Sequence, residues 1–354
     1  MQSAWQWMSL PRLSPGDSVA VLSPSFAAPA VGEAVHEQAM VRIREDLQLV
    51  PVEFRTTRQL HASPQERAAD VNAAFADPSI KAVMATIGGD DQITVLPHLN
   101  SEVIRHNPKP FFGYSDNTHL LNWLWRHGIP GFYGGSTQVH LGAGPRIDDV
   151  HLRSLQATLF HGGILEITDP GESEDYGLDW ADPRALTEFG YRTPTDPWLW
   201  AGPAWAVEGR TWGGCLEVID QLGVAGQLPS PHEVEHGILL LETSEELPSA
   251  DRVRRCVRAL GERGLLGVLN GVLIARPPAS SPKHRRSPAE QEKYRKDQAD
   301  VVVEQVNRYN PSAVVCAGVP FGHTRPQWVL PYGGLMRLDG VKRRITATYS
   351  GDRG

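Results

Sequence analysis

A serine that follows a short apolar run is the residue of this sequence best placed for nucleophilic chemistry. Residues 110–114 have the character of a buried strand, and Ser115 comes directly after them, where helical spacing begins. A strand-to-helix turn exposes a serine hydroxyl and leaves backbone N–H groups free for an oxyanion. Gly113 allows the bend. We interpret Ser115 as a candidate nucleophile. An ordinary structural turn is the alternative, because Asn117 stands where the usual Gly-x-Ser-x-Gly motif has glycine.

A serine hydroxyl needs a general base, and the sequence offers 13 histidines for that role. Several of them, His36 among them, lie in polar stretches where a solvated histidine is the usual interpretation. His323 differs, because it follows the apolar run 313–317 in a loop bounded by glycines. A parallel sheet presents reactive groups just past its strand ends. His323 is therefore the candidate base, and His119, one helical turn after Ser115, stays open with packing as its expected role.

A carboxylate should hold that histidine in the correct tautomer. Glu242 ends the strongly apolar run 237–241, and a charge at such a position is costly unless it has a partner. We expect His323 to be that partner. Glu245 and Glu246 compete for the same role, and a helix N-terminal carboxylate is the alternative for Glu242 itself.

A glycine-rich turn follows another buried-type run and could supply the second oxyanion donor. The turn reads Gly88-Gly89-Asp90-Asp91. We expect the N–H groups of Gly89 and Asp116 to hold the oxyanion. Gly88, Asp90 and Asp91 become candidate substrate contacts. A phosphate-binding or purely structural turn is the alternative, since two glycines alone do not decide it.

The order of apolar and amphipathic stretches predicts an α/β fold. Strands are expected at 18–22, 49–54, 80–87 and 110–114, with helices at 31–47, 64–76 and 93–105 between them. Such alternation favours a parallel sheet flanked by helices. We divide the chain into a nucleophile domain over 1–145, a linker with a Trp-rich loop over 146–206, and a smaller C-terminal α/β domain over 207–354. The segment 283–307 is interpreted as a solvated loop leading into a surface helix.

Composition narrows the class of protein. The 354 residues carry a net charge of −7, which disfavours nucleic acid as a partner. No apolar run approaches the roughly 18 residues of a membrane span, and residues 1–11 lack the pattern of a signal peptide. We expect a soluble cytoplasmic protein without membrane contact. The cysteines are Cys215, Cys256 and Cys316; their odd number and wide spacing predict neither a disulfide framework nor a metal site.

The chain resembles the LD-carboxypeptidase family of serine peptidases over roughly residues 14–338. The motifs that carry the resemblance are, in order, Gly88-Gly89-Asp90-Asp91, Phe112-Gly113-Tyr114-Ser115-Asp116-Asn117-Thr118, Gly213-Gly214-Cys215-Leu216-Glu217, Leu240-Leu241-Glu242-Thr243 and Gly318-Val319-Pro320-Phe321-Gly322-His323. The resemblance implies a Ser–Glu–His triad of Ser115, Glu242 and His323, with Glu and His supplied by the C-terminal domain. It also implies an N-terminal domain similar to class I glutaminases, and a metal-free, cofactor-free cytoplasmic homodimer.

Two branches of that family differ in substrate. One trims the terminal D-alanine from peptidoglycan tetrapeptides; the other resembles the microcin C immunity peptidases, which cleave aminoacyl-nucleotide antibiotics. The Gly-Gly-Asp-Asp turn is closer to the second branch, although its Asp90 and Asp91 replace an expected asparagine form and leave the acyl-side preference open. Trp198 and Trp200 resemble a loop that stacks on a nucleobase. Packing of these tryptophans against the second domain is one alternative, and a non-catalytic nucleotide-binding module is another. A class I glutaminase would require cysteine at position 115.

Overall fold

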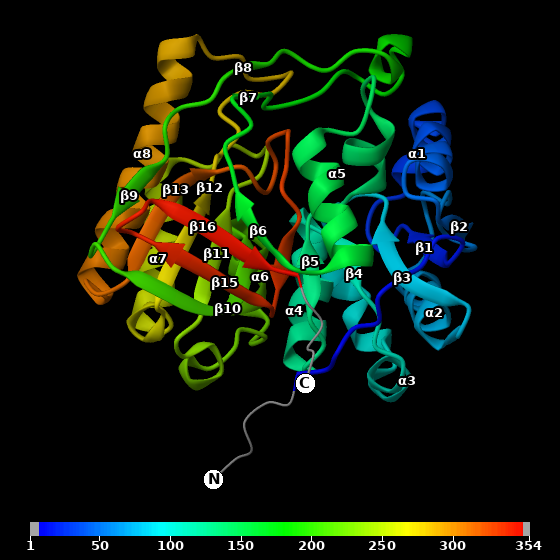
Figure 1. Cartoon of the computed structure of the whole chain (residues 1–354), viewed down its shortest axis with the longest axis horizontal. Helices are drawn as coiled ribbons and strands as arrows, with labels where there is room; N and C mark the ends of the chain where they lie inside the picture. Colours follow the sequence, from blue (N-terminus) through cyan, green and yellow to red (C-terminus); the bar gives the residue numbers. More distant parts are fainter. Residues whose placement is uncertain (1–6, 350–354) are drawn as a thin grey trace. The chain divides into compact units, whose positions relative to one another are not determined.

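The computed structural model describes residues 7–349, which form two compact units (Figure 1). Among these residues, unit 1 comprises 7–163, 177–190 and 349, and unit 2 comprises 164–176 and 191–348. The segment 146–206, interpreted above as a linker, is shared between both units. The outermost ends of the two predicted domains, residues 1–6 and 350–354, lie outside the described residues.

Unit 1 contains five parallel strands in the order β5-β4-β3-β1-β2. Their bounds are β1 Ser18–Leu22, β2 Val50–Glu53, β3 Ile80–Ala85, β4 Phe111–Gly113 and β5 Gly131–Tyr133. The central strands are almost wholly buried, as expected where helices cover both faces of a parallel sheet. The α/β class predicted from the alternation of strands and helices is confirmed.

Unit 1 contains both long and short helices, and some of them start at a capping side chain. They are η1 Ala28–Ala30, α1 Glu33–Glu45, α2 Pro64–Ala76, η2 Gln92–Thr94, η3 Leu96–His98, α3 Ser101–His106, η4 Ser115–Asn117, α4 Thr118–Arg126, η5 Thr137–Gly142, α5 Asp149–Gln156, η6 Ala157–His161 and η7 Pro183–Leu186. At α2, Ser63 and Glu66 form a capping box. The single helix expected at 93–105 is wrong: three short pieces replace it, because Pro97 interrupts the stretch and Asn100 caps a new start.

Unit 2 is built on an eight-stranded sheet in the order β6-β16-β15-β10-β11-β12-β13-β9. The strands are β6 Ile164–Ile167, β9 Leu199–Ala201, β10 Ala206–Cys215, β11 Ile238–Glu242, β12 Gly271–Ala275, β13 Val314–Val319, β15 Leu335–Asp339 and β16 Arg344–Thr348. β10 to β13 run parallel, and the remaining pairings are antiparallel. Parallel neighbours bring their carboxyl ends to one edge of the sheet.

The other elements of unit 2 are helices and short strands around this sheet. They are β7 Glu172–Ser173, β8 Thr193–Pro194, β14 Leu330–Tyr332, α6 Leu216–Val224, η8 Pro231–Val234, α7 Ala250–Glu262, η9 Leu266–Val268 and α8 Pro288–Tyr309. The two long helices α7 and α8 pack against each other (Figure 1, yellow and orange). Ser287 and Glu290 form a capping box at the start of α8, which explains why the surface helix starts where it does.

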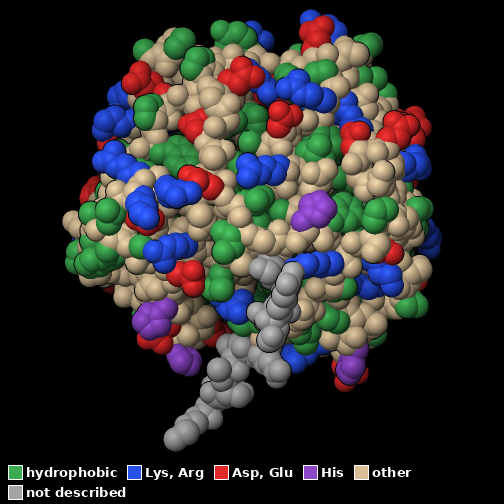
Figure 2. Space-filling model, in the orientation of Figure 1, with side chains coloured by type: hydrophobic (Ala, Val, Ile, Leu, Met, Phe, Trp, Pro, Cys, Tyr) green, Lys and Arg blue, Asp and Glu red, His purple; other side chains and the backbone are tan. Residues whose placement is uncertain are grey.

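The surface drawn in Figure 2 carries charges of both signs. Lys and Arg side chains lie among Asp and Glu side chains on this face and do not gather into one basic area. Within residues 7–349, no helix combines the length and the apolar character that a membrane crossing demands.

Candidate active site

Ser115 is the first residue of η4 and lies at the strained turn that follows β4. Its φ is +61°, in the left-handed region that residues with a side chain seldom adopt. Ser115 is partly exposed within the otherwise buried stretch 111–122. α4 begins three residues later, so a helix N-terminus lies next to the serine. The turn has the geometry of a nucleophile elbow.

Asn117 explains the departure from the generic motif. A Cβ at Gly113 would lie 2.7 Å from the Asn117 Cβ, so the asparagine packs directly against the glycine. Its Nδ2 donates to the carbonyl oxygens of Ile87, at 3.0 Å, and Tyr114, at 3.1 Å. Asn117 thereby joins the elbow to the chain that follows β3, which is a bracing role that glycine could not fill.

The Gly-Gly turn lies against the serine. A Cβ at Gly88 would lie 2.7 Å from the Ser115 Cβ and 3.1 Å from the Asp116 nitrogen, so a side chain there would collide with the elbow. Gly89 has φ +159°, and a Cβ on it would lie 2.0 Å from Ser25 Oγ. No hydrogen bond from the Gly89 N–H or the Asp116 N–H to another loop or turn is found among residues 7–349. The role of both groups as oxyanion donors stays a prediction.

The Asp116 carboxylate fixes the spacing between this turn and the elbow. Its Oδ2 accepts the Ser25 hydroxyl at 2.5 Å and the Gln92 N–H at 2.9 Å. Burial raises the pKa of Asp116, while these hydrogen bonds oppose the shift. His119, which the sequence left open as a base, is fully buried in α4 with its Nε2 3.5 Å from Asp116 Oδ1, and packing stays its expected role.

Asp91 anchors the other end of the turn. Arg67, 5% exposed, binds its two carboxylate oxygens at 2.7 Å each and also donates to the Ser25 carbonyl oxygen at 3.0 Å. Asp90 is exposed and remains a predicted substrate contact. Sequence reasoning missed Ser25 and Arg67. The available signal was that Ser25 follows β1, which ends at the same sheet edge as β3 and β4.

His323 and Glu242 meet in unit 2 as a buried pair. His323 Nδ1 lies 2.6 Å from Glu242 Oε2, and the carboxylate is fully buried at the end of β11. Gly322, with φ +80°, makes room for it, since a Cβ there would lie 2.5 Å from the same oxygen. Glu242 therefore occupies the position of an orienting carboxylate.

Glu245 contacts the opposite nitrogen of the ring. His323 Nε2 lies 3.2 Å from Glu245 Oε2, and the Glu245 side chain is 67% exposed. Burial alone would lower the pKa of His323, but Glu242 and Glu245 outweigh it and raise the pKa to about 9. Glu242 therefore contacts Nδ1, the nitrogen through which a carboxylate orients the ring. Glu245 contacts Nε2, the nitrogen that would serve as the base. No such contact is recorded for Glu246 among residues 7–349.

A buried glutamate that the sequence analysis did not select supports this loop. Glu217 Oε1 accepts the Ser244 N–H at 3.1 Å and its hydroxyl at 2.9 Å, and Glu217 Oε2 accepts the Cys215 thiol at 3.1 Å. Burial raises the pKa of Cys215, and the neighbouring Glu242 and Glu217 add to that effect. Glu217 lies in the Gly213–Glu217 motif, which was a usable signal.

The predicted stacking tryptophans both contact β13. Trp200 lies in β9, where it pairs in register with Cys316. Trp198 lies beside Gly318, with its ring 3.6 Å from the position of a Cβ there. The Trp198 Nε1 is buried without a hydrogen-bond partner among residues 7–349, and the stacking of both tryptophans on a nucleobase stays a prediction. The structure records no group of three or more His, Cys, Asp or Glu side chains suited to a metal among residues 7–349.

Models of two domains match this chain and decide its family. The LD-carboxypeptidase N-terminal domain matches residues 19–134, and the LD-carboxypeptidase C-terminal domain matches residues 208–338. The chain belongs to the LD-carboxypeptidase family. It is accordingly a serine peptidase.

Proteins similar to this chain include one named as a carboxypeptidase and one named as an immunity protein. One relative is a protein of Treponema pallidum named as a carboxypeptidase. It is 26% identical to this chain, and the match covers 94% of this chain and 93% of the relative. The microcin C7 self-immunity protein MccF of Escherichia coli is 27% identical over 80% of this chain and 78% of its own. A structure of MccF with glutamyl sulfamoyl guanosine shares the fold, with a TM-score of 0.81, 24% identity, and coverage of 97% of this chain and 99% of that one.

Proposed function

We propose that this LD-carboxypeptidase family member hydrolyses the amide-type bond of peptidyl- or aminoacyl-nucleotide antibiotics, using Ser115, Glu242 and His323 as its triad. The buried 2.6 Å pair of His323 with Glu242 carries the proposal, because an imidazole so held is built to accept a proton from a nucleophile. The strained elbow in unit 1 supplies that nucleophile. The similarity to MccF supports the choice of substrate class.

The proposed reaction has two halves. Ser115 Oγ attacks the carbonyl carbon while His323 Nε2 takes its proton, and the N–H groups of Gly89 and Asp116 hold the oxyanion. His323 then returns the proton to the departing nitrogen, and the acyl group remains on Ser115. A water molecule, deprotonated by His323, attacks the acyl-enzyme, and collapse of the second tetrahedral intermediate releases the acid and restores the serine.

Glu245 must leave Nε2 for this sequence to begin. Its side chain is largely exposed, so a rotamer change can carry it into solvent. With Glu245 in place, His323 is protonated below about pH 9 and cannot accept another proton. We infer that the approaching substrate, or higher pH, frees the ring.

Substrate recognition is proposed for the residues around these groups. Gly88, Asp90 and Asp91 would contact the acyl side, while Trp198 and Trp200 would stack on the nucleobase, at about 1–3 kcal/mol for each stacked base. The protein would act as a cytoplasmic homodimer without metal or cofactor, properties that come from the family resemblance.

A muropeptide LD-carboxypeptidase is the second candidate, and the family description itself favours it. The same triad would release a terminal D-alanine. Incubation of the purified protein with an aminoacyl sulfamoyl adenylate and, separately, with a muropeptide tetrapeptide distinguishes the two. We expect cleavage of the nucleotide conjugate. Cleavage of the tetrapeptide alone would establish the second candidate, and cleavage of neither with nucleotide binding retained would favour a non-catalytic module.

A further inference from the structure

Glu245 contacts the nitrogen of His323 that must be free in the proposed reaction. Its Oε2 lies 3.2 Å from Nε2, while the buried Glu242 contacts Nδ1 at 2.6 Å. A ring nitrogen that already carries a proton, held by a carboxylate, cannot accept a second one. The proposed base is therefore blocked in the free protein, and some group has to draw Glu245 away before each reaction.

Hydrogen bonds fix the backbone of the turn that carries Glu245. Glu217 accepts the Ser244 N–H at 3.1 Å and the Ser244 hydroxyl at 2.9 Å. The Ser244 hydroxyl oxygen in turn accepts the Glu246 N–H at 3.2 Å, and the Ser244 carbonyl oxygen accepts the Leu247 N–H at 3.2 Å. Leu247 has φ +54°, a left-handed value that residues with a side chain seldom adopt. Because the turn is held in this way, Glu245 can leave Nε2 by rotation of its side chain alone.

The Glu245 side chain makes only a weak contact with the protein. It is 67% exposed, and an ion pair at such a position adds little to stability. Among the described residues, no Lys or Arg side chain forms an ion pair with its carboxylate. Glu245 can therefore exchange His323 for another cation without disturbing the fold.

The charges around the ring favour a cation as the incoming group. Burial lowers the pKa of His323, but Glu242, Glu245 and Glu217 outweigh it and raise the pKa to about 9. One protonated imidazole balances only one of these three negative charges. A further anion beside Glu245 would be repelled, whereas an ammonium group would be attracted to it.

Aminoacyl substrates carry an ammonium group close to the reacting carbon. In an aminoacyl group, the α-carbon alone separates the α-nitrogen from the carbonyl carbon. Before reaction, this carbonyl carbon lies about 3–3.5 Å from the attacking oxygen, and the base lies about 2.6–3.2 Å from that oxygen. In the proposed reaction these short links bring the α-ammonium group near Nε2, where Glu245 lies. A peptidyl group has a neutral amide at the same place.

We propose that Glu245 selects substrates with a free α-amino group, because its carboxylate binds the α-ammonium group of the acyl residue and thereby leaves His323 Nε2. Without Glu245 the imidazolium is less stabilised, so it gives its proton to solvent and Nε2 can then accept the proton of Ser115. This inference rests on the proposed function, since it concerns the same triad, and it favours aminoacyl over peptidyl conjugates.

Two substrates that differ only at the α-position test this selection: alanyl sulfamoyl adenosine and its lactyl analogue, in which a hydroxyl replaces the amino group. We expect wild-type kcat/KM to be at least about tenfold higher for the alanyl compound. In Glu245→Gln this ratio should fall to about threefold or less, because the amide neither binds an ammonium group strongly nor holds a proton on Nε2. Glu246→Gln changes the exposed neighbour and should keep the wild-type ratio. Equal rates in the wild type, or an unchanged ratio in Glu245→Gln, would overturn the inference.

Calorimetry in a Ser115→Ala background measures recognition without turnover. The alanyl compound should bind at least about tenfold more tightly than the lactyl compound, and Ser115→Ala/Glu245→Gln should lose this difference. Equal affinities in Ser115→Ala would overturn the role of Glu245.

The two experiments separate this inference from the proposed function. Cleavage of both compounds at equal rates by the wild type would leave the hydrolysis standing and refute the selection. Cleavage of neither, with tighter alanyl binding that depends on Glu245, would refute the hydrolysis and support the selection. Absence of both cleavage and binding would overturn both proposals.

Discussion

His323 lies between two carboxylates that act on different nitrogens of its ring. Glu242 is buried at Nδ1, and Glu245 is exposed at Nε2. From the sequence, both glutamates are possible partners of His323. Only the position of Glu242 at the end of the buried strand β11 distinguishes it from the exposed Glu245. The sequence did not indicate that His36 is buried, because its polar neighbours favour a solvent-exposed histidine. His36 is fully buried near Glu53, and burial lowers its pKa. Histidine environment depends on tertiary neighbours that local pattern does not reveal.

Removing the charge of Glu245 should shift the pH dependence of catalysis. In the wild type, kcat/KM should rise with pH toward about 9, because His323 loses its proton only there. Glu245→Gln removes one of the charges that raise this pKa, so the acid limb should move to lower pH. Pre-steady-state and steady-state pH profiles measure it, with the exposed neighbour Glu246→Gln as control. An unchanged limb in Glu245→Gln, or an equal shift in the control, would refute the role of Glu245.

The same ion pairs bear on stability. Because the folded pKa of His323 is raised above its ordinary value near 6.5, the pairs stabilise the fold fully below that pH. Their contribution is lost as the pH rises through about 9. Denaturant unfolding across this window should show wild-type stability falling more than that of His323→Gln, and parallel curves would contradict the assignment.

At the scale of elements, the elbow depends on contacts between consecutive strand ends. The sequence placed Ser115 at the end of β4 and the glycine turn after β3, and the structure brings these two features into contact. It could not show that Ser25 and Arg67 hold the turn, because these residues lie far along the chain from Asp91 and Asp116. Parallel topology joins them at one edge of the sheet.

Gly88→Ala should impair catalysis without unfolding the protein. The new Cβ would lie 2.8 Å from Ser115 Oγ, so the serine or the turn must move. Loss of one oxyanion donor typically costs about 10²–10³-fold in kcat, and we expect a loss of that order. Kinetics together with circular dichroism measure it. The control is Gly223→Ala in α6, whose Cβ meets only Leu228 at 3.5 Å. Full activity in Gly88→Ala would contradict the close approach of the turn.

Restoring the generic motif should weaken the elbow. Asn117→Gly removes the donors to the Ile87 and Tyr114 carbonyl oxygens, and the net loss should be about 1–3 kcal/mol in the free energy of unfolding. Urea denaturation of the purified variant gives this value. Asn107→Gly, which removes a partly exposed amide bonded to Val103 O, serves as the comparison at another helix end. Equal stability of Asn117→Gly and wild type would show that the bracing is unimportant.

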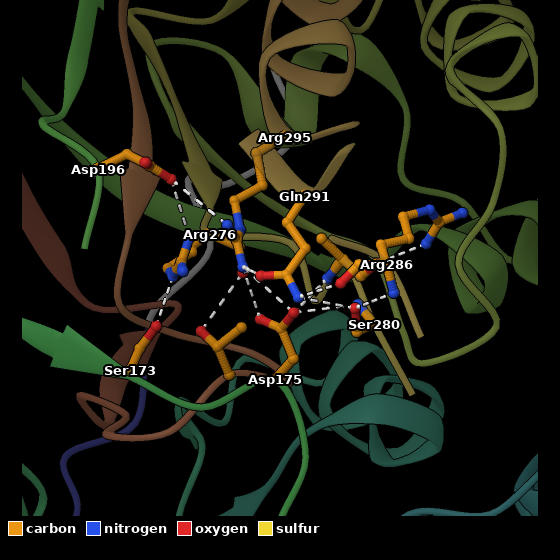
Figure 3. Close-up of polar contacts among 10 residues, drawn as sticks. Ser173, Asp175, Asp196, Arg276, Ser280, Arg286, Gln291 and Arg295 are labelled. Carbon is orange, nitrogen blue, oxygen red and sulfur yellow. Dashed lines mark hydrogen bonds and ion pairs between the residues drawn. The ribbon is translucent and has the colours of Figure 1, made fainter. Parts of the chain in front are cut away.

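At the scale of the whole molecule, the alternation of strands and helices in the sequence predicted the fold class. It did not predict which polar side chains, distant in the chain, bind one another. The segment 283–307 looked like a solvated loop and surface helix, and α8 indeed occupies most of it. Yet Arg295 is almost buried against Asp175, 120 positions earlier in the chain (Figure 3). The periodicity of apolar residues along the sequence indicates which side of a helix is apolar. It cannot indicate which acidic residue, far away in the chain, forms an ion pair with a charged residue of that helix.

Covalent labelling by a fluorophosphonate tests most directly whether Ser115 is activated by the Glu242–His323 pair. Mass spectrometry of the labelled protein should find the adduct on Ser115. Labelling should be at least about 10³-fold slower in His323→Ala and should retain wild-type speed in His284→Ala, whose histidine is exposed. An adduct on another residue, or labelling of Ser115 at an unchanged rate without His323, would contradict the triad.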